Sequence, residues 1–397
     1  AMTETKKNIL AMIFSIAVGL LLTETALQLF FPIEDPYQKH KDGKRLSLRY
    51  IESQFLPHQD WTFYCEPQLS GMADSARFTT NNLGFRGPEL IRPKPADELR
   101  IFMVGGSTTE CLFLDDTLAV THLLQDKLRE FYADSLNVKV YNAGKSGDKS
   151  YDHIAMLSHR ILHLQPDLVI IFAGINDLTA AQYDKDYIHM PVYDVYPDLN
   201  IINLARYFLT EFQLPRRLYY IFQPIFAAPT PEQIQMAIEF KSNYKGLVAL
   251  KESYPISDTP PKLDLPPYRR NLESIVGLCE SHAVQLVFMT QAVTWDSRID
   301  PDVTDWQWIT YKNGHHYKEE DMARAMAEYN LVMKSVAEKY DLPLFDLPEY
   351  MPKSLEFFYD DCHFNIAGSK RAAKLLSEFL HDNNLLREDS EDEKAIR

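Results

Sequence analysis

The first hydrophobic feature of the chain is a long apolar run near its N-terminus. Residues 9–22 carry no charge, and the apolar character resumes after Glu24 and continues to Phe31. As a helix, the whole run would be about 35 Å long, enough to cross the roughly 30 Å hydrocarbon core of a bilayer. Pro32 ends the pattern. We therefore predict a transmembrane anchor over residues 8–31.

A cleaved signal peptide is the alternative to an anchor, because Lys6 and Lys7 form a basic start. No small-x-small cleavage site follows Leu22, which favours the uncleaved anchor. Basic residues precede the run and also follow it, so the positive-inside rule does not decide the orientation. Since a long domain can translocate regardless of local charge, we expect the following domain to lie outside the cytoplasm, in a periplasm or at a cell surface.

Beyond residue 98, short apolar runs alternate with amphipathic helical patterns. Apolar runs bounded by turn residues are typical of buried strands in a parallel sheet, and apolar residues at helical spacing indicate helices. Their alternation predicts a parallel sheet with right-handed crossovers, and so an α/β fold. The predicted strands are residues 99–104, 138–141, 168–172, 285–290 and 344–347, and the predicted helices are residues 118–131, 151–164, 269–283 and 321–340, with a closing helix around residues 372–380.

Three segments fall outside this pattern. Residues 32–98 form a connecting region rich in turn residues, and residues 381–397 form an acidic tail. Within the main domain, residues 99–380, an aromatic-rich insertion occupies residues 178–283. We expect this insertion to be helical and to pack on the core; the alternative is a cap that lines an acyl pocket or rests on a membrane surface. Prolines between residues 255 and 267 predict a loop.

The composition argues against two classes of function. The net charge of −15 disfavours a nucleic-acid-binding protein, which needs a basic surface. The four cysteines are scattered and form no CxxC pair, which disfavours a zinc site. Their even number permits disulfide bonds without requiring them. The state of the thiols therefore stays open for Cys65, Cys111, Cys279 and Cys362.

Small polar loops follow the first three predicted strands. They contain Gly-Gly-Ser at residues 105–107, Gly-Lys-Ser-Gly-Asp at residues 144–148 and Gly-Ile-Asn-Asp at residues 174–177. Because ligands bind outside the carboxyl ends of the strands in open α/β sheets, these loops should converge on one site. Ser107 then stands where a nucleophile would stand, although a Gly-Gly-Ser loop taken alone could equally be a plain turn.

A loop before the closing helix supplies the residues that a serine nucleophile needs. Asp360 and His363 are close enough in sequence for one turn to present both side chains. His363 could take the proton of Ser107 as general base, while Asp360 holds its tautomer and stabilises the imidazolium. The backbone N–H groups of Ser107 and Gly147 and the side-chain amide of Asn176 are candidate donors to the oxyanion. This chemistry requires neither a metal nor an organic cofactor.

Four sequence blocks resemble the SGNH (GDSL-like) hydrolase family in their order. They are residues 105–107, 147–148, 174–177 and 360–363, and the similar region covers roughly residues 99–380. The resemblance implies an α/β fold of three layers, an α/β/α flavodoxin-like parallel sheet, here with a helical insertion and preceded by one transmembrane helix.

The same resemblance implies roles for individual residues. The spacing typical of the family favours Asp360 over Asp361 as the partner of the histidine. Gly106 stands where many members of the family have an aspartate. By this match the catalytic residues are Ser107, Asp360 and His363, and the oxyanion donors are Ser107, Gly147 and Asn176.

A narrower resemblance concerns the region before the first strand. An N-terminal anchor followed by Asn-x-Leu-Gly-Phe-Arg-Gly and then by Gly-Gly-Ser-Thr-Thr is similar to membrane-anchored SGNH proteins found beside membrane-bound O-acyltransferases. In such systems the SGNH component can move or remove acyl groups on exported glycans. A membrane O-acyltransferase is therefore a candidate partner.

The combined prediction is a membrane-anchored serine esterase or acyl-transfer enzyme that acts on acetyl-type O-acyl esters of glycans outside the cytoplasm. An acyl-enzyme would form on Ser107 and pass its acyl group to water or to a sugar hydroxyl. One alternative is a lipid esterase or lysophospholipase at the membrane surface. The other is a non-catalytic partner subunit of a membrane O-acyltransferase complex.

Overall fold

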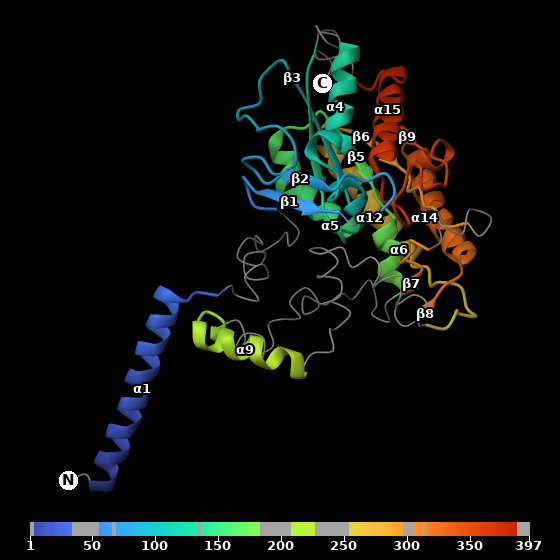
Figure 1. Cartoon of the computed structure of the whole chain (residues 1–397). Coiled ribbons are helices and arrows are strands. Elements are labelled where there is room, and N and C mark those ends of the chain that lie inside the picture. Colours follow the sequence, from blue (N-terminus) through green and yellow to red (C-terminus); the bar gives the residue numbers. More distant parts are fainter. Residues whose placement is uncertain are drawn as a thin grey trace. The chain divides into compact units, whose positions relative to one another are not determined.

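A computed structural model shows the arrangement of the chain in two compact units (Figure 1). The first unit is Ala1–Ser47 with Met190–Gln235, and the second is Leu48–His189 with Met236–Arg397. Of the predicted acidic tail, residues 387–397 lie outside the described part, as do residues 183–207 and 227–253 of the predicted insertion. The structure describes residues 4–33, 55–65, 69–132, 136–182, 208–226, 254–296, 303, 305–312 and 315–386.

In its described part, the first unit is built on α1 (Glu4–Phe30) and α9 (Gln213–Phe226). None of the residues of α1 is buried, and its most apolar stretch has a mean hydropathy of 2.0. By length and composition this helix could cross a membrane or serve as a signal sequence. The insertion predicted over residues 178–283 is divided between the two units, because α9 belongs with α1.

A five-stranded parallel sheet forms the centre of the second unit (Figure 1). Its strand order is β4-β3-β5-β6-β9, which is the flavodoxin-like order when the five strands are numbered along the chain. Val104 of β3 is paired with Ala143 of β4 and with Ile171 of β5, so these three strands end at the same edge. The predicted α/β fold is confirmed. The strands are β3 (Glu98–Gly105), β4 (Asn137–Gly144), β5 (Leu168–Phe172), β6 (Gln285–Met289) and β9 (Leu344–Phe345).

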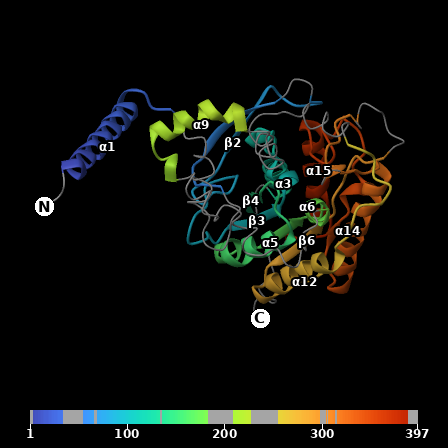
Figure 2. The ribbon, with the colours of Figure 1, turned by 90° about the horizontal axis from the view of Figure 1, so that it is seen from below.

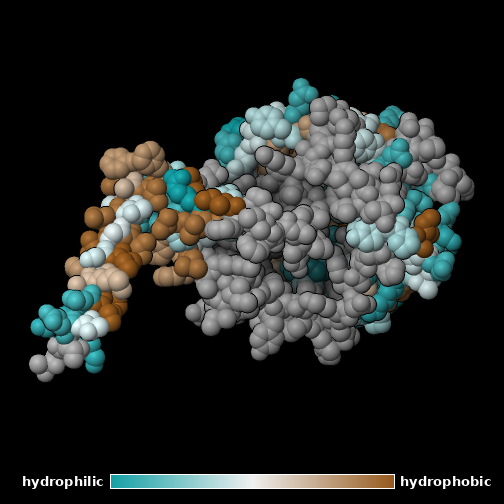
Figure 3. Space-filling view, turned by 60° about the horizontal axis from the view of Figure 1, so that its bottom comes forward, coloured by the Kyte–Doolittle hydropathy of each residue, from teal (hydrophilic) through white to brown (hydrophobic). Residues whose placement is uncertain are grey.

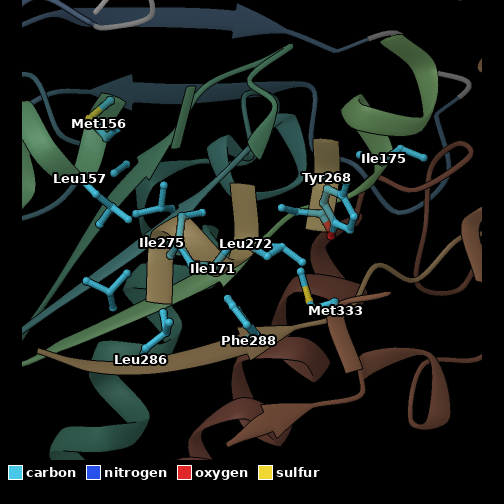
Figure 4. Close-up of a cluster of buried hydrophobic side chains, with 14 of the residues drawn as sticks. Met156, Leu157, Ile171, Ile175, Tyr268, Leu272, Ile275, Leu286, Phe288 and Met333 are labelled. Atoms are coloured by element: carbon cyan, nitrogen blue, oxygen red, sulfur yellow. The ribbon is translucent and has the colours of Figure 1, made fainter. Parts of the chain in front are cut away.

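Helices cover both faces of the sheet and give the fold three layers (Figure 2). Along β3, Ile101 and Met103 belong to the core with α4 and α15, whereas Phe102 and Val104 belong to the core with α5, α12 and α14. Figure 4 shows part of the second core, where Leu272 of α12 lies among side chains of β5, β6 and α14. The helices are α4 (Val120–Tyr132), α5 (Ser150–Met156), α6 (Ile175–Ala181), α12 (Leu265–Ser281), α14 (Glu319–Lys339) and α15 (Ile366–Asp382).

Two helices differ from their predicted limits. The helix predicted from residue 269 begins at Leu265, inside the proline-rich stretch that predicts a loop. Two prolines occupy its first turn, where the fixed φ suits a helix and the missing N–H has no partner to lose. The helix predicted over residues 151–164 is interrupted after α5 by a π-helical turn (Leu157–Ile161) and a 3-10 turn (Leu162–Leu164).

The second unit also contains other short elements. They are 3-10 turns (Asp116–Leu118, Leu347–Glu349), β7 (Tyr311–Lys312) and β8 (His315–His316).

Part of the predicted connecting region is folded into the second unit. β1 (Asp60–Tyr64) and β2 (Ser75–Thr79) form an antiparallel hairpin. Phe78 of this hairpin and Phe85 just after it are buried. The described residues between 55 and 98 therefore contribute to the core, which the prediction of a connection did not anticipate.

Arg86 fastens this segment to the loops at the edge of the sheet. Its buried guanidinium donates to the backbone carbonyl groups of Glu110, Cys111 and Leu114. It also pairs with the carboxylate of Asp116, at an N–O distance of 2.6 Å. The guanidinium also reaches the carbonyl of Arg77 at 3.5 Å, and Asp116 is shared with Thr79, so one side chain links several segments at this edge.

We expect Arg86→Met to lower the free energy of unfolding by about 3–5 kcal/mol, because it removes the cation that pairs with Asp116 and the donor to three buried carbonyl groups. Urea unfolding of the full chain in detergent, followed by tryptophan fluorescence, measures the change. Arg77→Met is the matched control, since the pair between Arg77 and Asp60 is exposed and should contribute little. Equal midpoints for the wild type and Arg86→Met would contradict this role of Arg86.

Candidate active site

The predicted nucleophile follows β3 at the carboxyl edge of the sheet. Gly105 and Gly106 lead from the strand into α3 (Ser107–Glu110), so the serine is the first residue of this short helix. At Gly106 a Cβ would lie 2.3 Å from Nδ2 of Asn176, so a larger residue would require this amide to shift. At Gly105 a Cβ would lie 2.5 Å from the carbonyl oxygen of Phe172. Neither glycine has a positive φ. Glycine is therefore favoured at both positions because neighbouring groups approach the backbone closely, and not because of an unusual backbone conformation.

A continuous chain of hydrogen bonds links the three predicted catalytic residues. The Oγ of Ser107 lies 2.7 Å from Nε2 of His363. On the other side of the ring, Nδ1 of His363 lies 2.7 Å from Oδ2 of Asp360 and 2.9 Å from its Oδ1. With the ring proton on Nδ1, Nε2 is free to accept the proton of the serine hydroxyl. The structure therefore brings these residues together in the arrangement that their predicted roles require.

Asp360 is held firmly in this position. Its fully buried carboxylate accepts hydrogen bonds from the backbone N–H groups of Cys362, at 3.0 Å, and His363, at 2.8 Å. The indole N–H of Trp308 donates to the same carboxylate at 3.1 Å. These donors stabilise the ionised form and fix the direction in which it faces the imidazole.

The neighbouring Asp361 has different partners. It accepts the indole N–H of Trp295 at 2.6 Å and the backbone N–H groups of Trp308 and Ile309 at 2.7 and 3.1 Å. Both of its oxygens are engaged by these donors, so the carboxylate anchors the segment around Trp308. The choice between Asp360 and Asp361, which the sequence left to the family spacing, thus has a structural reason.

The charge of Asp360 governs the protonation of His363. Burial lowers the pKa of His363, but the adjacent carboxylate of Asp360 raises it more, and the resulting pKa lies well above the ordinary value. The imidazolium formed during proton transfer is therefore stabilised. Burial and the charge of Asp360 also raise the pKa of Asp361, to about 6.

The loops that contain the predicted oxyanion donors meet beside Gly106, the residue before the nucleophile. Nδ2 of Asn176 donates to the carbonyl oxygen of Asp148 at 2.9 Å and lies beside the α-carbon of Gly106. Gly147, in the same loop as Asp148, has a φ of +85°, which favours glycine. The backbone N–H of Ser107 is at the start of α3. The structure gathers these groups, and their roles as oxyanion donors stay a prediction.

Glu110 is a positioning residue that the sequence reasoning missed. Its buried carboxylate accepts the backbone N–H of Ser146 at 2.8 Å and also the hydroxyl of that serine. The ammonium group of Lys145 forms an ion pair with the carboxylate of Glu110, at an N–O distance of 3.9 Å. The bonds tie the nucleophile helix to the loop that contains Gly147. The signal in the sequence is an acidic residue in the first turn after Ser107.

Asp177 ties the second and third loops together in a similar way. Its carboxylate accepts the backbone N–H of Ser150 at 3.2 Å and the hydroxyl of Ser150 at 2.6 Å. Asn271 of α12 donates to the same hydroxyl at 2.9 Å. This bracing agrees with the structural role that its position in the sequence suggests.

The four cysteines of the chain are buried free thiols. Burial raises the pKa of Cys362 to about 11, so the thiol stays protonated at neutral pH. Its sulfur lies close enough to Asp360 and His363 for the three side chains to surround a metal ion. A protonated thiol is a poor ligand, and Nδ1 of His363 is already bonded to Asp360. These residues therefore fit proton transfer better than metal binding.

The sequence matches a known family over this whole region. The model of the GDSL-like lipase/acylhydrolase family covers residues 103–371, which is more than half of the chain. The chain belongs to this family. Membership confirms the SGNH resemblance and identifies an ester-hydrolysing serine enzyme. No curated protein matches the sequence significantly.

Solved structures of other hydrolases are similar to this chain at low sequence identity. They include an acetylxylan esterase from Geobacillus stearothermophilus (17% identity, 71% of this chain and 93% of that chain, TM-score 0.40), an alpha/beta hydrolase from the metagenome of Lake Arreo, Spain (17%, 74% and 99%, 0.41), and an acetyl xylan esterase (12%, 70% and 97%, 0.39).

We expect Asp360→Asn to reduce kcat by about 10⁴-fold, because the imidazole loses the group that holds its tautomer and stabilises its charge. Activity requires neutral His363, so kcat/KM should rise as the pH rises through the pKa of this histidine. In the wild type this rise should occur at a pH above the ordinary pKa of histidine. In Asp360→Asn it should occur at a lower pH, because the negative charge that raises the pKa of His363 is absent. The pH profile with a short-chain nitrophenyl ester measures both effects.

Asp361→Asn is the matched comparison for this experiment, since it removes the adjacent charge but keeps the pair between Asp360 and His363. Its kcat should fall much less. A loss in Asp361→Asn as large as in Asp360→Asn would show that the partner of His363 has been assigned to the wrong carboxylate.

Proposed function

We propose that this protein is a membrane-anchored serine esterase or acyl-transfer enzyme that acts on acetyl-type O-acyl esters of glycans outside the cytoplasm. The observation that carries the proposal is the hydrogen-bonded chain from Ser107 through His363 to Asp360 in a member of an acylhydrolase family. These hydrogen bonds support ester hydrolysis by a serine nucleophile. A small cavity beside Ser107 supports the short acyl group, and the apolar helix α1 supports the location at a membrane.

The reaction begins with attack of the Ser107 Oγ on the ester carbonyl as His363 takes the hydroxyl proton. The negative charge of the tetrahedral intermediate is stabilised by the N–H groups of Ser107 and Gly147 and by the amide of Asn176. When the carbonyl re-forms, the ester C–O bond breaks, and His363 gives its proton to the departing sugar oxygen. An acyl-enzyme on Ser107 remains.

The second half of the reaction removes the acyl group. Water, or a sugar hydroxyl, attacks the acyl-enzyme while His363 takes the proton of the attacking oxygen. The bond to Oγ then breaks, and the proton returns to Ser107. With water the product is a free carboxylic acid, and with a sugar hydroxyl it is a new ester, so the same residues serve a hydrolase and a transferase.

A cavity next to the nucleophile supports a short acyl group. Its walls include Ser107, Phe113, Leu114 and Tyr359, and its volume is about 10 Å³. This is close to the least space that holds one water molecule. A methyl group is of comparable size, whereas a longer acyl chain would require the apolar walls to move. The pocket therefore favours acetyl esters over fatty-acyl esters.

The membrane setting is supported by α1 and by the narrower sequence resemblance. None of the apolar side chains of the helix is buried, and the helix is long enough to cross a bilayer. A single-pass anchor of this kind would hold the enzyme at the outer face of the membrane, where exported glycans pass. A membrane-bound O-acyltransferase is the partner that the resemblance suggests, and it would supply or use the same acyl groups.

We expect the full chain in detergent to release acetate from an acetylated polysaccharide and to be labelled by a fluorophosphonate probe. Ser107→Ala should abolish both, because the nucleophile is lost. Release of fatty acid from lysophospholipid, lost in Ser107→Ala and faster than release of acetate, would favour a lipid esterase instead. A folded wild type that is neither labelled nor active would point to a non-catalytic partner subunit.

We expect Leu114→Ala to shift the preference of the enzyme toward longer acyl chains, since it enlarges the cavity beside Ser107. An added methylene in an apolar pocket changes specificity by about 10–200-fold. The ratio of kcat/KM for nitrophenyl butyrate to that for nitrophenyl acetate measures the shift. Leu128→Ala, a buried truncation in α4 outside the cavity, controls for general loss of stability. An unchanged ratio in Leu114→Ala would exclude this cavity as the acyl site.

A further inference from the structure

Glu24, the charged residue inside the apolar helix α1, binds the N-terminus of α9. Its carboxylate accepts the backbone N–H of Gln213 at 2.5 Å and that of Leu214 at 2.9 Å. The first N–H groups of a helix have no partner within the helix, and a negative charge there is favourable. Glu24 thus acts as a cap for a helix that lies far along the chain.

Further hydrogen bonds hold α9 at the C-terminal end of α1. The side chain of Gln213 accepts the backbone N–H of Ile33 at 2.8 Å, and Arg216 donates to the carbonyl of Ile33 at 3.0 Å. Arg217 donates to the carbonyl of Phe31. Two guanidinium groups and one amide therefore satisfy the carbonyl and N–H groups where α1 ends, and the start of α9 is fixed there.

One face of α9 is apolar and exposed. Leu214, Leu218 and Ile221 are spaced to lie along one side of the helix, and the last two are 47% and 62% exposed. Gln213 and Tyr220 are turned away from this side by roughly 110–130°. The turn before α9 adds three more exposed apolar side chains: Phe208, Leu209 and Phe212. Contiguous exposed apolar surface of this kind marks a site of interaction.

The position of this face identifies a lipid bilayer as its occupant. α1 is about 40 Å long, and the charges before Glu24 are confined to its first turn. In a bilayer, its C-terminal end would therefore lie at the boundary between acyl chains and headgroups. Figure 3 shows hydrophobic residues, in brown, over most of the visible surface of this N-terminal helix, with hydrophilic residues at its first turn. A helix fastened to the other end is held at the same boundary.

From these contacts we infer that α9 lies in the plane of the membrane interface, with Leu218, Ile221 and the preceding aromatic turn in the acyl boundary and Arg216 and Arg217 at the level of the headgroups. The inference rests on the membrane anchoring proposed above. Residues 190–235, which include α9, stand in sequence between the two parts of the catalytic unit. The chain would therefore meet the membrane twice, first at α1 and again at α9. The ester-hydrolysing site is then joined to the bilayer by more than the one segment after α1.

Nitroxide labels at Leu218→Cys and Ile221→Cys test this placement in the full chain reconstituted into vesicles of phosphatidylcholine and phosphatidylglycerol. Collisions with oxygen, which concentrates in the acyl region, and with a water-soluble nickel chelate report depth. We expect the ratio of oxygen to nickel collisions to be several-fold higher at both positions than at Tyr220→Cys, the control that is turned away from this side. The native cysteines are buried, and unsubstituted chain carried through the labelling gives their background.

Each other outcome overturns the inference in an identifiable way. Labels at positions 218 and 221 that are as open to nickel as the control would place the face in water. Labels shielded from both reagents would indicate that protein, such as a second copy of the chain, covers it. Flotation of the vesicles separately tests the anchor, because a chain that floats with water-exposed labels retains its anchor without an interfacial α9. Esterase activity of each labelled chain shows that it is folded.

Discussion

The buried carboxylate of Asp360 is the constraint on which the active site depends. Its oxygens accept hydrogen bonds from Cys362, from the backbone and ring of His363, and from the indole of Trp308. An ionised carboxylate is costly to bury unless such donors surround it. The donors must therefore be in place before the ring can be oriented toward the serine. The segment around Trp308 is thus required for assembly of the site, although it contributes no catalytic residue.

Two adjacent carboxylates have separate tasks because their surroundings differ. Asp361 accepts N–H groups from Trp295, Trp308 and Ile309, and so holds the very segment that orients its neighbour. Burial beside another carboxylate raises the pKa of Asp361 to about 6, whereas the proximity of Asp360 raises the pKa of His363. One charged group therefore shapes the titration of both residues, and the site operates as a coupled set.

The parts of the fold and site that could be predicted share a local signal. β5 has the limits predicted from its apolar run, and the serine, histidine and aspartate lie in or directly after loops marked by glycines or by close spacing. Contacts between distant segments give no such signal. The bonds of Arg86 to carbonyl groups and of Glu110 to Ser146 have no periodicity, and the hairpin of β1 and β2 is too short to stand out. Pro266 and Pro267 misled the prediction because proline also suits the first turn of a helix.

Glu24 is the clearest example of a contact between distant segments that the sequence does not indicate. From the sequence alone, a carboxylate within an apolar helix suggests either a side chain that reaches the membrane surface or a contact with another membrane protein. Its partners are backbone N–H groups of Gln213 and Leu214, and backbone groups carry no mark in a sequence. A charge that would be costly in a bilayer is stabilised here by capping the N-terminus of α9. The residue that looks least suited to α1 is thus the one that joins α1 to α9.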